Sequence, residues 1–78
     1  VSVGTSGSKV IELTANLNEA DALQTKTMAI FDMTGRQVLT QSFESGNTQV
    51  YIPNANGVYL VQVQIGNTQK VFKVLIQD

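Results

Sequence analysis

The sequence predicts an all-β domain, built as an antiparallel sandwich or a small barrel, and three observations support this. Apolar and polar side chains alternate with a period of two in most segments of the chain. Turn residues, chiefly Gly, Asn and Ser, separate these segments at roughly regular intervals. No segment has a convincing helical pattern. Six or seven short strands in this arrangement are typical of antiparallel sandwiches and small barrels.

The clearest element is a hairpin in the C-terminal third of the chain. Its first strand is expected over residues 59–65, after an Asn/Gly turn at residues 54–57, and its second strand runs almost to Asp78. Gly66-Asn67 suits a two-residue loop of type I′ or II′, because Gly and Asn accept a positive φ at little cost. Tyr59 is expected to place its ring in the core and its hydroxyl at the rim. The apolar face of the hairpin comprises Tyr59, Val61, Val63, Ile65, Phe72, Val74 and Ile76.

Further strands are expected upstream, at residues 1–3, 9–15, 27–32, 36–43 and 48–52. Turns are expected at residues 4–8, 33–35 and 44–47, and Pro53 ends the strand before it because it cannot donate a ladder hydrogen bond. Residues 16–26 allow two interpretations. They form either a long polar loop, which we favour, or a short helical turn capped by Asn16 with Glu19.

Length and composition describe a small domain that depends on packing. Seventy-eight residues make a single domain, residues 1–78, with an expected stability of only about 3–5 kcal/mol. The chain contains no Cys, so neither a disulfide nor a thiolate metal site supports it. We expect it to be the end of a longer protein, because Val1 begins in the middle of a pattern. The predicted core comprises Ile11, Leu13, Met28, Ile30, Val38, Val50, Ile52, Tyr59, Val61, Val63, Phe72, Val74 and Ile76.

Charge and hydropathy argue against nucleic-acid binding and against a membrane-spanning segment. The formal net charge is −1, which argues against a nucleic-acid binder, since such a protein needs a basic face to neutralise phosphates. Charged residues make up 14% of the chain, compared with about 25% in an average soluble domain, so the polar surface must consist of Thr, Gln, Asn and Ser. No apolar run approaches the roughly 20 residues of a membrane span.

The residue types also argue against catalysis. No His is present, which excludes an imidazole base, a Ser-His-Asp triad and a histidine metal site, and no Cys is present to act as a nucleophile. Glu19 and Asp21 are interpreted as solvated loop charges, with a paired-carboxylate glycosidase site or a weak calcium site as alternatives. We therefore expect no enzyme activity, no cofactor and no metal.

Two groups of residues have both a structural and a functional interpretation. Asp32, Gly35 and Arg36 describe either a well-formed hairpin turn, with Arg36 facing solvent, or a recognition corner. Lys70 and Lys73 either protect an end strand against edge pairing or contact a receptor. Residue chemistry alone favours the structural interpretation for both groups.

Three segments, taken in order, are similar to the motifs of one known family. Residues 30–39 resemble a corner of the form hydrophobic–Asp/Asn–x–x–Gly–Arg/Lys–x–Val. Residues 53–63 resemble a Pro–x–Gly–x–Tyr strand, and residues 70–76 resemble a closing Lys–hydrophobic strand. From about Lys9 to the end, the set resembles the C-terminal sorting domain of type IX secretion cargo proteins of Bacteroidetes. Two features depart from the family: residues 1–7 replace a Pro-Asn-Pro start, and one or two extra residues separate Pro53 from Gly57.

The resemblance implies a small Ig-like antiparallel β-sandwich of about seven strands that acts as a secretion signal. Family members are exported through the periplasm and across the outer membrane by the type IX translocon, with a shuttle protein. A sortase then usually cleaves before the domain, and the cargo is anchored at the cell surface or released. By matching positions, the residues implied in recognition, or in shaping the recognised surface, are Gly35, Arg36, Gly57, Tyr59, Lys70, Lys73, Val74, Leu75 and Ile76.

An Ig-like adhesion or carbohydrate-binding accessory module is the alternative function. Such modules usually expose an aromatic platform for stacking on sugars. This chain has few aromatic residues, and at least two of them should be in the core: Phe31, Phe43, Tyr51, Tyr59 and Phe72. In either case we expect a homodimer by edge-strand pairing or strand exchange, because a short sheet with apolar edge strands can pair with a second copy.

Overall fold

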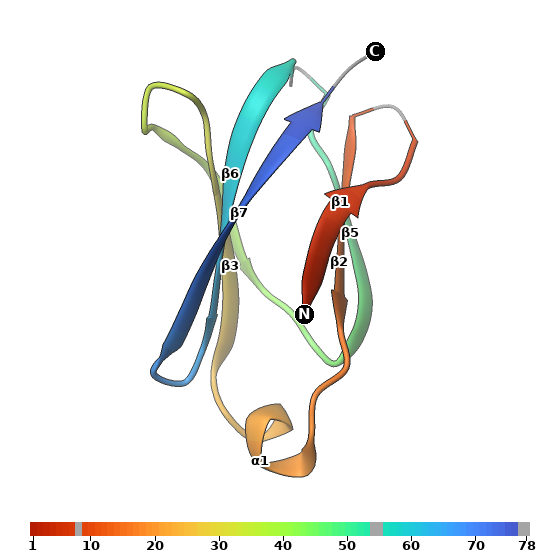
Figure 1. The fold of residues 1–78 in the computed structure, drawn as a ribbon, viewed down its shortest axis with the longest axis vertical. Coiled ribbons are helices and arrows are strands. Elements are labelled where there is room, and N and C mark those ends of the chain that lie inside the picture. Colours follow the sequence, from red (N-terminus) through yellow and green to blue (C-terminus); the bar gives the residue numbers. More distant parts are fainter. Residues whose placement is uncertain (8, 54–55, 77–78) are drawn as a thin grey trace.

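The computed structural model describes residues 1–7, 9–53 and 56–76, and it places them in two antiparallel β-sheets packed face to face (Figure 1). One sheet has the strand order β1 (Ser2–Thr5), β2 (Val10–Ala15) and β5 (Gly46–Tyr51). The other has the order β4 (Gln37–Ser42), β3 (Lys26–Phe31), β6 (Gly57–Ile65) and β7 (Thr68–Ile76). The seven strands of the described residues confirm the predicted all-β antiparallel sandwich of about seven strands.

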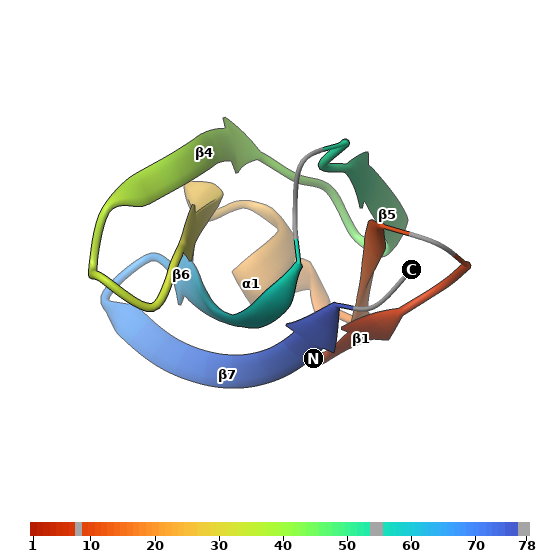
Figure 2. The same cartoon turned by 90° about the horizontal axis from the view of Figure 1, so that it is seen from above.

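The connections between the sheets determine which strands lie at the edges. The chain crosses between the sheets after β2, by way of the short helix α1 (Glu19–Ala22), and again after β4 and after β5. The helix lies across the lower end of the sandwich, and the edge strands β1 and β7 lie side by side (Figures 1 and 2). In the immunoglobulin constant arrangement the fourth strand joins the sheet of the first two strands, whereas here β4 pairs with β3. The immunoglobulin likeness stays a prediction.

The core lies between the two sheets and is filled by the period-two alternation of the strands. Every second residue of β2 and of β3 is buried, as the sequence pattern predicts. Tyr59 and Phe72 pack against this core but remain partly exposed. All predicted core residues except Val38 therefore lie in or against the core. The buried apolar side chains are Ile11, Leu13, Ala15, Met28, Ile30, Phe43, Val50, Ile52, Val61, Val63, Val74 and Ile76.

The assignment of Val38 to the core is wrong. Its side chain is 42% exposed, and the neighbouring Leu39 packs against the core instead. The register between β3 and β4 shifts next to this position: Ile30 pairs with Leu39, but Phe31 pairs with Gln37. Leu39 pairs with the buried Ile30 and shares its inward face, so the adjacent Val38 faces outward. The β-bulge then leaves Val38 with no partner opposite it.

The hairpin of β6 and β7 forms as predicted around Gly66-Asn67. Ile65 pairs with Thr68, which leaves a two-residue loop between the strands. Gly66 has a φ of 57°, whereas Asn67 does not have a positive φ, so the turn fits type II′ rather than type I′. The N–H of Gly66 also donates to the carbonyl oxygen of Thr25 at 2.9 Å, which ties the tip of the hairpin to the loop before β3.

Both structures considered for residues 16–26, a polar loop and a short helical turn, are present, because one helical turn lies inside a longer loop. The helix is capped by Asn18 rather than by Asn16. The Oδ1 atom of Asn18 accepts a hydrogen bond from the N–H of Asp21 at 2.8 Å. Asparagine is among the best residues at this position, because its side chain satisfies an N–H that the first turn leaves without a partner.

Lys26, expected at the end of this loop, instead begins β3 with its side chain buried. Its ammonium group donates to the carbonyl oxygens of Ala22 at 2.6 Å and Gln24 at 3.0 Å. The Oε2 atom of Glu44 lies 3.8 Å away, but the Glu44 side chain is largely exposed, so this ion pair adds little stability. Lys26 therefore closes the loop mainly by satisfying backbone carbonyl groups.

Some predictions fall on residues that the structure does not describe. These predictions concern residues 54 and 55 of the Asn/Gly turn, residue 8 at the end of the turn predicted over residues 4–8, and the chain beyond Ile76. No helix among the described residues is long and apolar enough to cross a membrane.

Candidate functional site

The first candidate site is the corner that joins β3 to β4. The N–H of Gly35 donates to the carbonyl oxygen of Asp32, and the N–H of Asp32 donates to that of Arg36, both at 3.0 Å. Gly35 has a φ of 86°, a conformation that a residue with a Cβ rarely adopts. These bonds describe a three-residue hairpin loop that ends in a left-handed glycine, and they explain why the motif has Gly at this position.

The carboxylate of Asp32 organises the same corner. Its Oδ1 atom accepts the N–H groups of Thr34 and Arg36, both at 3.0 Å, and the Thr34 hydroxyl at 2.6 Å. Its Oδ2 atom accepts the Nε of Arg36 at 3.3 Å, while the Arg36 side chain is 82% exposed. The hairpin interpretation of this motif is therefore confirmed, with Arg36 facing solvent. A recognition role for Arg36 stays a prediction.

The hydrogen bonds to Asp32 make the stability of the corner depend on pH. The Thr34 side chain, followed by the Arg36 N–H, lowers the pKa of Asp32 below its usual value of 3.8. A lowered pKa in the folded state means that the stabilisation is present above pH 4 and is lost as the pH falls through the folded-state pKa. We expect Asp32→Asn to lower the thermal midpoint at pH 7 by more than it does near pH 3. An equal difference at both pH values would contradict this assignment.

The second candidate site is the start of β6, where the Gly57 and Tyr59 motif lies. Gly57 pairs with Ile76, and Tyr59 pairs with Val74 on the same face of the sheet. The Tyr59 ring packs against the core, and its hydroxyl accepts the N–H of Asn56 at 3.4 Å. The predicted placement of the ring in the core and the hydroxyl at the rim is confirmed.

The third candidate site is β7, whose residues divide between two faces. Val74 and Ile76 are 5% and 0% exposed, so no partner can contact them while the domain is folded. Lys73 and Leu75 face outward, and Leu75 is 54% exposed. Lys70 is exposed although it lies on the inward face, where it pairs with the buried Val63.

The strand register brings most of the predicted site residues to one end of the four-stranded sheet. Phe31, which precedes the corner, pairs with Leu60, and Leu60 pairs with Lys73. The β3–β4 corner, the start of β6 and the end of β7 therefore lie at the same end of this sheet, at the top of Figure 1. Lys70 lies apart from this group, toward the opposite end.

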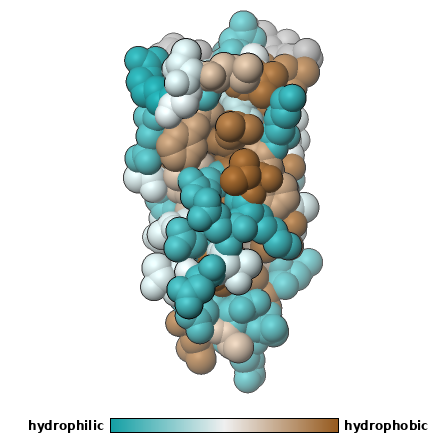
Figure 3. Space-filling model, turned by 60° about the vertical axis from the view of Figure 1, so that its left-hand side comes forward, coloured by the Kyte–Doolittle hydropathy of each residue, from teal (hydrophilic) through white to brown (hydrophobic). Residues whose placement is uncertain are grey.

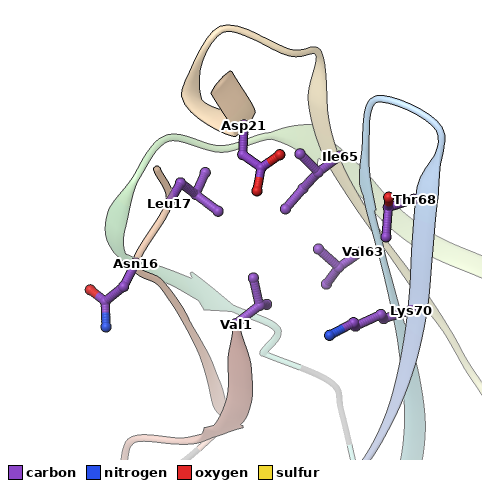
Figure 4. Close-up of a pocket in the computed structure, with 8 residues that line it drawn as sticks. All are labelled: Val1, Asn16, Leu17, Asp21, Val63, Ile65, Thr68 and Lys70. Carbon is purple, nitrogen blue, oxygen red and sulfur yellow. The ribbon is translucent and has the colours of Figure 1, made fainter. Parts of the chain in front are cut away.

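A pocket of about 210 Å³ lies at that opposite end, close to α1 (Figure 4). The Asp21 carboxylate points into it from the helix, and the Lys70 side chain reaches its edge from β7. Among the described residues, no group of three His, Cys, Asp or Glu side chains could hold a metal ion. The residues that line the pocket are Val1, Asn16, Leu17, Asp21, Val63, Ile65, Thr68 and Lys70.

The pocket was not predicted from the sequence, and only Lys73 and Leu75 of the outward face of β6 and β7 were predicted as recognition residues. The pocket combines residues from both ends of the chain, so no local pattern could predict it. The outward face had a signal: Leu60, Val71 and Leu75 are apolar at positions where the alternation of a half-buried strand predicts polar residues.

Comparison with known proteins identifies the family. Residues 6–77, nearly the whole chain, match the family model described as the secretion system C-terminal sorting domain. The matched region contains the corner, β6 and β7, which are the segments that carry the resemblance. Comparisons with curated proteins and with solved structures found no significant match. The chain therefore belongs to the family of secretion system C-terminal sorting domains, the sorting tails of type IX secretion.

Proposed function

We propose that this domain is a secretion signal that the type IX translocon and a shuttle protein read in its folded form. In this proposal a sortase then cleaves before the domain, and the cargo is anchored at the cell surface or released. The family match supports the general part of this function, namely interaction with the type IX machinery and export across the outer membrane. The observation that supports recognition of the folded form is the burial of Val74 and Ile76. Because these residues of the closing motif belong to the core, the motif takes its shape only when the domain is folded.

A folded signal of this kind has a physical rationale. The last strand, β7, completes the four-stranded sheet and contributes buried side chains to the core. It can pair with β6 only after the whole preceding chain has been synthesised. The recognised shape therefore forms only once β7 has been synthesised and has paired with β6.

The adhesion or carbohydrate-binding alternative receives less support from the aromatic residues. Phe43 is buried, and Tyr59 and Phe72 pack against the core. Of the aromatic residues that the structure describes, Tyr51 is the one that is largely exposed, at 64%, while Phe31 is half-buried on the other sheet. A single exposed ring is not the platform that stacking on a sugar chain requires. We also propose no catalytic role, because the chain has neither His nor Cys.

A transport experiment tests the proposed function. The 78-residue chain is fused to the C-terminus of a fluorescent protein that carries an export signal, and the fusion is expressed in a bacterium with a type IX system. We expect fluorescence at the cell surface or in the medium, whereas the same reporter without the chain stays in the periplasm. Periplasmic retention of the complete fusion would contradict the sorting function, and glycan binding with loss in Tyr51→Ala would then support the alternative.

Homodimerisation remains part of the proposal. The strand β7 is the end strand of its sheet and is longer than its neighbour β1, so part of its edge extends beyond that strand. An uncovered strand edge presents backbone groups that can pair with a second copy. Light scattering on the isolated chain measures this directly, and a strict monomer at high concentration would contradict it.

A further inference from the structure

The outward side of the four-stranded sheet carries a group of apolar side chains, which we term the outer apolar face. Leu60, Val71 and Leu75 are 38%, 58% and 54% exposed. The register makes their positions adjacent: Leu60 pairs with Lys73, which lies between Val71 and Leu75 on the same side of β7. The space-filling view shows apolar surface gathered in the upper half of this side, bordered by polar surface (Figure 3). The face comprises Phe31, Val58, Leu60, Val71 and Leu75, with Lys73 among them.

These residues lie outside the core that joins the two sheets. A sheet with one solvated face normally places polar residues there, and scattered exposed apolar residues are common on any protein. Here the side chains come from three neighbouring strands and meet on one face. Contiguous exposed apolar surface of this kind marks an interaction site on soluble proteins.

The strands of this sheet carry positively charged side chains but no negatively charged ones. None of the strands β3, β4, β6 and β7 contains an Asp or a Glu. Lys73 therefore lies within the outer apolar face without a carboxylate on any strand of its sheet. Arg36, which directly precedes β4, already donates a hydrogen bond from its Nε to Asp32.

We propose that the outer apolar face is the surface that docks on the secretion machinery, and that its partner is an apolar protein surface with a carboxylate opposite Lys73. This inference rests on the proposed sorting function. The apolar side chains supply burial, and a partner carboxylate would compensate the lysine charge that docking removes from water. The predicted recognition residues Lys73 and Leu75 belong to this face, whereas Val74 and Ile76 support it from behind.

Two other occupants fit the charges less well. A second copy stacked on this face would bring two lysines into an apolar interface to which neither sheet contributes a carboxylate. An anionic membrane surface attracts clusters of several cations, and this face has Lys73 alone. A protein surface with one matching acidic residue suits a single central lysine.

The two lysines of β7 provide a matched test. Lys73→Glu reverses the charge on the outer apolar face, and Lys70→Glu makes the same change three residues away on the opposite face of the sheet. We expect Lys73→Glu to reduce export of the fluorescent fusion by about tenfold or more, since loss of a docked charge pair is worth at least one factor of ten. Lys70→Glu leaves the outer apolar face unchanged and should reduce export by a smaller factor than Lys73→Glu. Equal export of both variants, or equal loss in both, would overturn the proposal.

Apolar substitutions test the same face independently of charge. Leu60→Gln with Leu75→Gln is compared with Leu23→Gln, which changes an 87% exposed leucine far from the face. The double variant should lose export and the control should not, while thermal unfolding confirms that all of these chains remain folded. Export of the double variant at the control level would overturn the proposal.

The remaining outcomes distinguish the occupants and the underlying function. Binding to vesicles that contain anionic phosphatidylglycerol, lost in Lys73→Glu, would assign the face to lipid and overturn the protein partner. A dimer that disappears in Leu60→Gln with Leu75→Gln would assign it to a second copy and also overturn it. If the unchanged fusion is not exported, the sorting function fails; if it is exported and the face variants are too, only this inference fails.

Discussion

Ile76→Ala is expected to lower the free energy of unfolding by about 2–5 kcal/mol. The Ile76 side chain is fully buried, on the strand that closes the four-stranded sheet opposite Gly57. Truncation leaves a cavity between two sheets whose paired strands can collapse only partly. A domain of this size has a total stability of about 3–5 kcal/mol, so this single change should unfold a large share of the molecules. Urea unfolding followed by circular dichroism measures the loss.

The neighbouring residue provides the control for this prediction. Leu75 lies on the same strand but is 54% exposed on the opposite face. Leu75→Ala should therefore change the free energy of unfolding by no more than about 0.5 kcal/mol. Equal losses in the two variants would show that the faces of β7 are assigned incorrectly.

The same pair separates stability from recognition in the export assay. Ile76→Ala should reduce export because the recognised surface no longer forms, and its unfolding curve should show the cause. Full export of an unfolded Ile76→Ala chain would mean that the machinery reads an extended segment rather than a folded domain. The Leu75→Ala chain stays folded, so any loss of export in it reports on contact with the partner.

Phe43→Ala is expected to lower the free energy of unfolding by about 3–5 kcal/mol. Phe43 follows β4 at the crossing between the sheets, and its side chain is only 4% exposed. Its N–H donates to the carbonyl oxygen of Lys26 at 3.2 Å, which holds the crossing against the start of β3. Thermal or urea unfolding of the purified chain measures the effect.

Tyr51 provides a matched aromatic control for Phe43. Its side chain is 64% exposed on β5, so Tyr51→Ala removes a ring of similar size from the surface rather than from the core. We expect Tyr51→Ala to cost less than about 1 kcal/mol. Comparable losses in the two variants would contradict the placement of Phe43 as a core residue.

Local pattern was enough to predict most strands and most of the core. The alternation in β2 and β3 buries every second residue, and the turns at Gly35 and Gly66 follow from the φ values that glycine accepts. These features depend on neighbouring residues in the chain. The Asp32 corner is of the same kind, because its hydrogen bonds join residues no more than four positions apart.

The errors arose where pairing with another strand overrides the local pattern. The sequence pattern places Val38 inward, but pairing with the buried Ile30 places Leu39 inward instead, and the register shift leaves Val38 without a partner. Lys26 reads as part of a polar loop, yet the carbonyl groups of Ala22 and Gln24 allow its ammonium to be buried. In both cases the orientation of the side chain depends on a partner group that is brought close only when the chain folds back on itself.

Periodicity, turn chemistry and motif order are properties of the linear chain, so the fold class, the C-terminal hairpin, the Asp32 corner and the family could all be predicted from the amino-acid sequence. The tertiary structure alone decided which residues of β7 are accessible and which side chains meet on the outer apolar face. Strands far apart in the sequence form that face, and their register places Leu60 opposite Lys73. The physical reason is that contact across a sheet depends on strand order and register, which the sequence determines only through the packing of the whole domain.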